Sequence, residues 1–140
     1  MKVLGIDYGD KSIGLAIFDV DIGFIYPLKT IFRKRKNILR KSLVEIENIV
    51  NINDIKKIVI GIPLNVDGSI SYRVEETKKF YEKLKIRLSH QIDILFEDER
   101  FTTIEAKEKL AYKKMNKTEQ KLYVDQIAAC LILENYKNRR

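Results

Sequence analysis

The chain has 140 residues, of which 45% are hydrophobic and 34% are charged, a composition typical of one globular domain with a highly charged exterior. Its formal net charge of +7 favours polyanion partners, although a charge excess that serves solubility alone would explain it equally well. No apolar run reaches the roughly 18 residues of a membrane span, and Asp7 falls where a signal peptide would be apolar, so we expect one cytoplasmic domain over residues 1–140.

Two apolar runs near the N-terminus predict a β-hairpin. Residues 3–7 and 12–18 each have the continuous hydrophobicity of a buried strand. The turn between them contains Gly9 and Asp10, which favour a tight reversal of the chain. A third strand is predicted over residues 23–31, so the chain is expected to begin with three strands joined by short turns.

Helices and strands are predicted to alternate from there onward. A helix is expected over residues 37–51, because four apolar residues share one face at helical spacing: Leu39, Leu43, Ile46 and Val50. Residues 57–62 form an apolar run that Pro63 ends, as expected of a strand buried on both faces. Ser71 is placed to cap the next helix, whose apolar side comprises Val74, Phe80, Tyr81 and Leu84.

The last third of the chain is predicted to contain one strand and two helices. The strand covers residues 92–97, a helix capped by Thr103 reaches to about residue 114, and the last helix covers residues 118–138. The single cysteine, Cys130, lies in an apolar run of that helix and is expected to be buried. The order β-β-β-α-β-α-β-α-α predicts an α/β fold with a mixed five-stranded sheet and helices on both faces.

Acidic residues occur where such a sheet gathers its chemistry, at the carboxyl ends of buried strands. Asp7 ends the first predicted strand, and Asp98 and Glu99 follow the fifth. A carboxylate at this position loses solvation and requires a hydrogen-bond donor, a cation or a metal. Taken singly, Asp7 could be bonded to the turn amides after it, and Arg100 could pair with either later acid. Taken together, two acidic sites at neighbouring strand ends indicate a metal site.

Asp125 is the third acid of interest, because it lies on the packing face of the last helix. The other residues of that face are small or apolar: Ala128, Ala129, Ile132 and Tyr136. A lone aspartate at the edge of such a face usually reaches water or a lysine, but Asp7 and Glu99 would give it a site to face. Three or four carboxylates suffice for Mg²⁺ or Mn²⁺, and two such ions about 3.5–4 Å apart support phosphodiester hydrolysis.

The same residue inventory argues against other hydrolytic sites. The only histidine, His90, lies in a polar stretch that predicts a surface loop, and Cys130 is distant from it. A serine triad or a cysteine–histidine protease site is therefore implausible.

Basic residues form two blocks that are candidate nucleic-acid contacts. One block comprises residues 33–36 with Arg40 and Lys41, and the other comprises Lys113, Lys114 and Lys117. Charge runs are usually solvated faces. Both blocks nevertheless lie on connections into or between helices, where binding residues are common.

Four segments together resemble the YqgF/RuvX family of bacterial Holliday-junction-resolvase-like proteins, which are regarded as pre-rRNA nucleases. In chain order they are GIDYGDKSIGLA (residues 5–16), GIPLNVDGS (61–69), DERFTTIEA (98–106) and VDQIAACLILENY (124–136). Any one of these matches alone would be weak. Their order over nearly the whole chain makes the resemblance specific.

The resemblance implies an RNase H-like fold and a metal-dependent endonuclease that uses Mg²⁺ or Mn²⁺ and matures the 5′ end of pre-16S rRNA. The family's acidic positions carry over to Asp7, Asp98, Glu99 and Asp125 as catalytic residues, with Asp7 and Asp125 as metal ligands. Either Asp98 or Glu99 would be the third metal ligand, and Glu99 is favoured, with Asp98 assisting. Substrate contacts are expected from Lys11, Arg33, Arg35, Asn65, Arg100, Thr102 and Thr103. For Asn65, a role in forming the turn before Gly68 is an equally good explanation.

The expected partner is therefore nucleic acid, with pre-rRNA favoured over branched DNA, together with the small ribosomal subunit and no membrane. We expect a monomer or a weak homodimer. One alternative is a resolvase of four-way DNA junctions, which would require a symmetric dimer. Another is a non-catalytic RNA-binding assembly factor, which would gain nothing from carboxylates near phosphates. A third is an ATPase of the actin-like or sugar-kinase type, but such enzymes clamp nucleotide between two domains of this fold.

Overall fold

The computed structural model describes residues 1–34, 39–64, 67, 71–99, 105–106, 108 and 116–139. Five strands and three helices lie in these residues, in the order β1 (Lys2–Tyr8), β2 (Ser12–Asp19), β3 (Phe24–Phe32), α1 (Arg40–Ile52), β4 (Lys57–Ile62), α2 (Tyr72–Arg87), β5 (Asp93–Asp98) and α4 (Lys117–Asn138). The helix that the sequence predicts between Thr103 and residue 114 falls almost entirely outside the described residues.

The strands form one mixed sheet in the order β3-β2-β1-β4-β5. β2 pairs antiparallel with both β1 and β3, whereas β4 pairs parallel with both β1 and β5. The predicted mixed five-stranded sheet is confirmed. Because β1, β4 and β5 run in the same direction, their carboxyl ends meet at one edge of the sheet.

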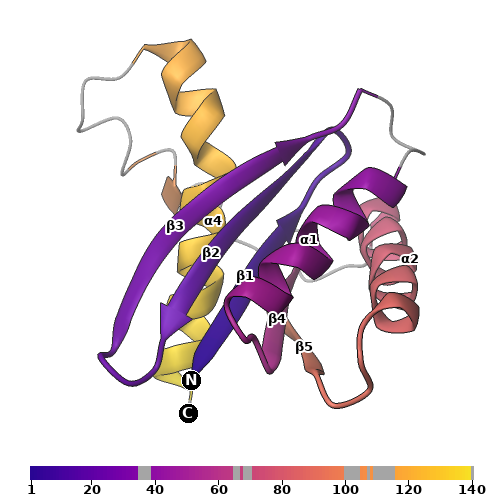
Figure 1. The fold of residues 1–140 in the computed structure, drawn as a ribbon. Helices are drawn as coiled ribbons and strands as arrows, with labels where there is room; N and C mark the ends of the chain where they lie inside the picture. Colours follow the sequence, from indigo (N-terminus) through magenta and orange to yellow (C-terminus); the bar gives the residue numbers. More distant parts are fainter. Residues whose placement is uncertain are drawn as a thin grey trace.

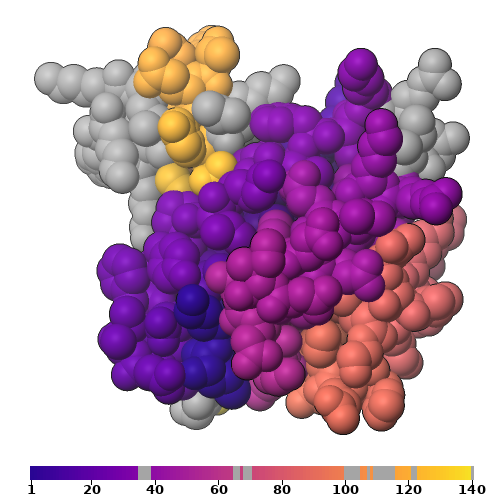
Figure 2. Space-filling view, viewed as in Figure 1, coloured from indigo at the N-terminus to yellow at the C-terminus, as the bar shows by residue number. Residues whose placement is uncertain are grey.

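Helices cover both faces of the sheet, as predicted (Figure 1). On one face, α1 and α2 pack over a core that includes Ile6, Leu15 and Ile60. The four residues predicted for the inner face of α1 are all buried: Leu39, Leu43, Ile46 and Val50. On the other face, α4 packs over a smaller core that includes Val3, Phe18 and Val59. In the space-filling view, the first turns of α4, coloured orange, project at the top of the molecule above the strands (Figure 2).

α4 approaches the sheet closely because small residues line the contact. Ala128 and Ala129 are fully buried on the helix, and Ala16 is fully buried beneath it. A Cβ atom placed on Gly5 of β1 would lie 2.6 Å from Cγ of Leu133, inside normal contact distance. The backbone of β1 therefore supports α4 directly. Within the described residues, no helix has both the length and the hydrophobicity to cross a membrane.

Two local expectations about helices were wrong. Ser71 occupies the N-cap position of α2, but its side chain makes no capping hydrogen bond. Helix α4, by contrast, is capped by a side chain: Oδ1 of Asn116 accepts a hydrogen bond from the backbone N–H of Glu119 at 2.8 Å. This helix begins one residue before the predicted start. Cys130 is half-buried rather than buried, because it lies at the edge of the packing face.

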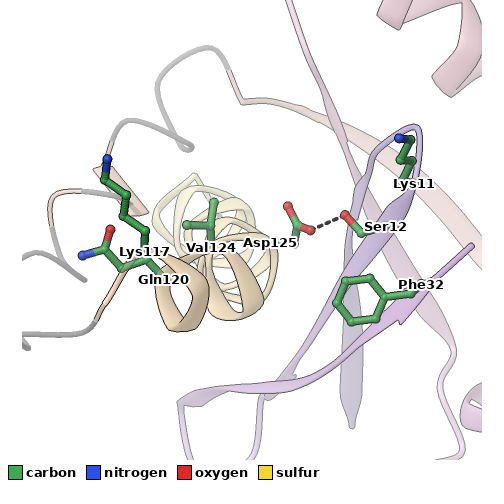
Figure 3. A pocket seen from close by; sticks show the side chains of 7 residues that line it. All are labelled: Lys11, Ser12, Phe32, Lys117, Gln120, Val124 and Asp125. Atoms are coloured by element: carbon green, nitrogen blue, oxygen red, sulfur yellow. Dashed lines mark hydrogen bonds between the residues drawn. The ribbon is translucent and has the colours of Figure 1, made fainter.

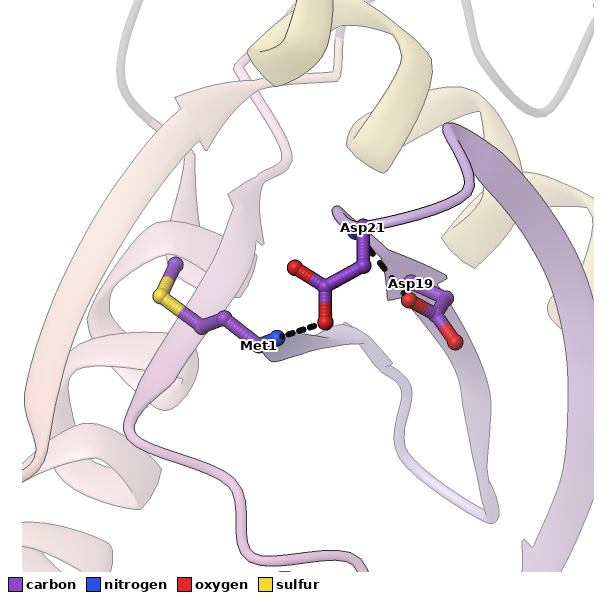
Figure 4. A network of polar contacts seen from close by, with 3 residues as sticks. All are labelled: Met1, Asp19 and Asp21. Atoms are coloured by element: carbon purple, nitrogen blue, oxygen red, sulfur yellow. Dashed lines mark hydrogen bonds and ion pairs between the residues drawn. The ribbon is translucent and has the colours of Figure 1, made fainter.

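The start of β1 is fixed by polar contacts to the turn after β2 (Figure 4). The N-terminal amine of Met1 lies 2.8 Å from Oδ2 of Asp21, and the backbone N–H of Asp21 donates to Oδ1 of Asp19 at 3.1 Å. Figure 1 shows the start of β1 and the end of α4 at this end of the sheet. Asp7 is the sixth residue of β1 and lies near the carboxyl end of that strand.

Candidate active site

Asp7 lies on the face of the sheet that α4 covers. It pairs with Gly14 of β2 and is the penultimate residue of β1, since Tyr8 rather than Asp7 ends the strand. Alternate residues of a strand point to opposite faces. Gly5 lies beneath Leu133 of α4, whereas Ile6 and Tyr8 belong to the core under α1 and α2. The Asp7 side chain therefore projects toward α4.

Glu99 reaches Asp7 across the intervening strand. Its backbone N–H donates to the carbonyl of Ile62 at 3.1 Å, which continues the pairing of β4 and β5 one residue beyond β5. Its carboxyl group lies within hydrogen-bonding reach of that of Asp7. β4 lies between β1 and β5, and Gly61 leaves the necessary space: a Cβ atom there would lie 2.6 Å from Oε2 of Glu99.

Asp98 projects to the other face of the sheet. Glu97 binds Arg139 of the α4 segment at 3.1 Å, so alternation directs Asp98 toward the α2 side and Glu99 back toward α4. The structure thus brings Glu99 into contact with Asp7. The catalytic role expected of Asp98 stays a prediction.

Burial dominates the electrostatics of the Asp7–Glu99 pair. Asp7 is 7% exposed and Glu99 is 6% exposed. Desolvation raises the pKa of Asp7 to about 6, partly offset by the hydrogen bond with Glu99 and by the charge of Arg73. Desolvation, together with the charge of Asp7 and the same hydrogen bond, raises the pKa of Glu99 well above its usual range. The two carboxyl groups therefore take up and release protons as one coupled pair.

Asp125 completes an acidic group at the same edge. α4 crosses β2 at Gly14, where any Cβ atom would overlap the carbonyl oxygen of Asp125. The charge of Asp125 raises the pKa of both Asp7 and Glu99, so its carboxylate lies within electrostatic range of the pair. The Asp125 carboxylate accepts a hydrogen bond from the hydroxyl of Ser12 (Figure 3).

These three acids supply oxygen donors of the kind that Mg²⁺ and Mn²⁺ prefer. A cation between Asp7 and Glu99 would also relieve their mutual repulsion. Among the residues that the structure describes, however, no three acidic, histidine or cysteine side chains are already arranged around a metal position. The hydrogen bond from Ser12 holds the Asp125 carboxylate near the other two acids. The donor set fits a divalent metal, with two ligands in contact and the third held nearby.

Two predicted substrate contacts lie beside the β1–β2 turn. Lys11 is exposed on that turn. Arg33 is only 6% exposed, and its Nη2 donates to the carbonyls of Gly9 and Asp10, both at 2.6 Å. The guanidinium also lies 5.0 Å from the ring centroid of Tyr8. Arg33 therefore stabilises the turn after Asp7, and its predicted contact with substrate stays a prediction.

The remaining predicted substrate contacts lie outside the described residues: Arg35, Asn65, Arg100, Thr102 and Thr103. Conversely, the sequence interpretation missed Arg73, Ser12 and Gly61. Ser12 and Gly61 fall within recognised motif segments, which could have drawn attention to them. Arg73 carries no such signal, because its proximity to the acids depends on how α2 packs against the sheet.

A groove opens beside Asp125, between the β1–β2 hairpin and the start of α4 (Figure 3). Its volume is about 710 Å³. Lys11, Ser12 and Phe32 line the sheet side, and α4 contributes Lys117, Gln120 and Val124. The groove therefore places two lysines, Lys11 and Lys117, on the same surface as Asp125.

Comparison with known sequences identifies relatives over nearly the whole chain. The model of a family described as "RuvX: Holliday junction resolvase" matches residues 1–139. A protein of Caldanaerobacter subterraneus subsp. tengcongensis is 41% identical over an alignment of 141 positions, gaps included. The alignment covers 97% of this chain and 95% of that protein. A protein of Lachnospira eligens is 36% identical over 136 residues, covering 97% and 96%. Both carry the provisional name pre-16S rRNA nuclease.

Comparison with solved structures supports the predicted fold. The structure of T. thermophilus RuvC in complex with a Holliday junction substrate superimposes with a TM-score of 0.60, at 14% sequence identity, over 99% of this chain and 96% of that chain. Such resolvases have an RNase H-like fold. The expected RNase H-like architecture is therefore confirmed.

Proposed function

Since this chain belongs to the RuvX family, we propose that it is a metal-dependent endonuclease that processes the 5′ end of pre-16S rRNA. The names of the relatives in Caldanaerobacter and Lachnospira support the choice of substrate. One structural observation carries the chemistry: Asp7 and Glu99 are buried in mutual contact and face Asp125. A non-catalytic RNA-binding protein would have no use for such a costly acidic group.

Asp7, Glu99 and Asp125 would hold Mg²⁺ or Mn²⁺ in this proposal. Two bound ions would activate the attacking water and stabilise the leaving oxygen of the phosphodiester. The chain's own contribution is to position the acids. Burial under α4 excludes water around Asp7 and Glu99, and Gly61 lets the two carboxyl groups meet across β4.

Basic residues near the acids would orient the substrate. Arg73 lies close enough to lower the pKa of both Asp7 and Glu99. Exposed Lys11 lies on the turn that Arg33 stabilises. A phosphate entering along the groove would meet Lys11 before it reached the carboxylates.

The proposal is tested by cleavage of a labelled RNA that spans the 5′ end of 16S rRNA and its leader. We expect cleavage with Mg²⁺ or Mn²⁺, and a roughly 100-fold or greater loss in Asp7→Asn and Asp125→Asn. Asp93→Asn is the matched control, because Asp93 is an exposed acid at the opposite end of β5. Equal cleavage by all four proteins would contradict the proposed site.

A four-way DNA junction is the alternative substrate that the family description favours. The same proteins should be assayed on a labelled junction in parallel. Depletion of the protein in cells, followed by mapping of the rRNA 5′ ends, gives the decisive comparison. We expect 5′-extended 16S rRNA, whereas accumulated junctions with normal rRNA ends would favour the resolvase.

A further inference from the structure

The groove beside Asp125 carries an exposed aromatic ring on the same face of the sheet as the acids. Phe32, the last residue of β3, pairs directly with Ser12 of β2. Directly opposed residues on neighbouring strands project to the same face. Ser12 bonds Asp125 on the α4 side, so Phe32 also projects to the α4 side, into the groove (Figure 3).

Phe32 is unusual because it is 63% exposed despite lying in a concave surface. An exposed phenyl ring in a groove remains available to stack on a planar ligand. The α4 side of the groove adds the aliphatic surface of Val124 and the amide of Gln120. This combination suits a flat, partly apolar group with polar edges.

Cations flank this aromatic surface on both sides. Lys11 lies on the side of the groove formed by the β1–β2 hairpin. Lys117, the first residue of α4, lies on the helix side. Both lysines are exposed. Two cations separated by a stacking surface match the repeating phosphates and intervening base of a single-stranded nucleic acid. In a continuous duplex the bases are already stacked on one another and cannot offer a face to Phe32.

We propose that this groove binds a single-stranded polynucleotide, with an unpaired base stacked on Phe32 and flanking phosphates bound by Lys11 and Lys117. The inference rests on the proposed function, since the polynucleotide in the groove would be the one that the acids Asp7, Glu99 and Asp125 cut. It specifies that the nucleotides beside the cut are unpaired. RNA and DNA share this chemistry, so both are compared in the test.

Phe32→Trp converts the proposed stacking surface into a probe. The chain contains no tryptophan, so the substituted indole is its single fluorophore of this kind. We expect a 12-nucleotide single-stranded RNA or DNA to quench its emission, measured in Ca²⁺ without Mg²⁺ or Mn²⁺ to prevent cleavage. A fully paired duplex of the same sequence should quench it much less. Phe24→Trp is the matched control, because Phe24 is 57% exposed at the other end of the same strand.

Binding constants from fluorescence anisotropy of labelled oligonucleotides provide a second readout. Phe32→Ala should weaken single-strand binding roughly tenfold, whereas Phe32→Tyr and Phe24→Ala should bind nearly as wild type does. Lys11→Gln and Lys117→Gln should each lower the slope of log K against log salt by about 0.7, as expected for one lost phosphate contact. A preference for RNA over DNA would identify the natural strand.

The inference is overturned if Phe32→Ala binds single strands as wild type does, or if it weakens duplex binding equally. Quenching by an acidic peptide but not by oligonucleotides would also overturn it and indicate a protein partner. These failures are distinct from failure of the proposed function. Loss of binding in Phe32→Ala with no metal-dependent cleavage by wild type would support the groove and contradict the nuclease.

Discussion

Asp7 and Glu99 hold two carboxyl groups in contact inside the protein, where ionisation is unfavourable. Burial raises the pKa of Asp7 to about 6 and that of Glu99 well above its usual range. In the metal-free protein at high pH, ionisation of both acids therefore lowers the stability of the folded state. Stability should increase as the pH falls through these raised values, because the folded state takes up protons before the unfolded state does.

Asp7→Asn should reduce this pH dependence and leave the part that burial of Glu99 causes. At pH 8 the variant should be more stable than the wild type without metal, by about 2–3 kcal/mol, and this advantage should disappear toward pH 4. Urea denaturation in EDTA at several pH values measures the difference. A difference in unfolding free energy that stayed constant from pH 8 to pH 4 would mean that Asp7 ionises normally.

Substitution of the two adjacent acids distinguishes their roles. Glu99→Gln should lose metal binding and cleavage, because Glu99 contacts Asp7. Asp98→Asn should retain Mn²⁺ binding within about threefold of wild type, since Asp98 projects to the α2 side. Titration calorimetry with Mn²⁺ measures both. The reverse order of effects would reassign the ligand to Asp98.

At the level of elements, the site depends on how β2 and β4 leave space for their neighbours. Gly61 in β4 admits the Glu99 carboxyl, and Gly14 in β2 admits the backbone of α4 at Asp125. Each glycine provides a close approach between two elements that are distant in the sequence. The acids therefore meet only when the strand order and the helix position are both correct.

Gly61→Ala should separate Glu99 from Asp7. The new methyl group would lie 2.6 Å from Oε2 of Glu99 and 2.5 Å from Cδ1 of Ile132, which should cost about 1–3 kcal/mol of stability and most of the metal affinity. Gly5→Ala is the matched control. Its methyl group would crowd Leu133, which belongs to α4 as Ile132 does, rather than the carboxyl group of Glu99. Thermal unfolding should detect a loss in both variants, and Mn²⁺ titration a loss in Gly61→Ala only. Equal metal binding by the two would contradict the role of Gly61.

Most elements were predictable because their signals are local. The apolar run of β4 was predicted with the bounds Lys57–Ile62 that the structure has. The buried Leu43, Ile46 and Val50 of α1 were also predicted, although this helix begins at Arg40 rather than at residue 37. The cap of α2 was predicted wrongly, because a serine at an N-cap position need not direct its hydroxyl to the helix. Helix α4 began at Lys117 rather than at the predicted residue 118.

The candidate site was predictable only in part, because its geometry is non-local. Asp7, Glu99 and Asp125 were identified from their positions at strand ends and on a helix face. The bond between Ser12 and Asp125, and the proximity of Arg73, follow from how distant elements pack. No periodicity or spacing in the chain encodes those contacts directly.

At the level of the whole molecule, the proposed metal site would connect segments from both ends of the chain. Asp7 lies in the first strand, Glu99 follows the last strand, and Asp125 lies in the final helix. An ion bound by all three would therefore link the sheet to α4. Metal binding should act on the stability of the entire fold.

Addition of Mn²⁺ or Mg²⁺ should raise the thermal unfolding temperature more at pH 8 than at pH 5, because protons compete with the metal for Asp7 and Glu99. At a metal concentration about 100 times the Kd, the stabilisation should be on the order of 3 kcal/mol. Differential scanning calorimetry measures the shift, with Asp7→Asn as the variant that should not respond. An equal shift at both pH values, or in Asp7→Asn, would place the ion elsewhere.

The missing side chain at Gly61 has a consequence for recognising active members among related sequences. A homologue could retain every acidic residue and still be inert if a larger residue stood at this place in β4, the strand between the two acids. Counting aspartates and glutamates would classify that homologue as an enzyme, whereas inspecting the strand between them would not. The glycine is thus a marker of competence that an inventory of catalytic acids overlooks.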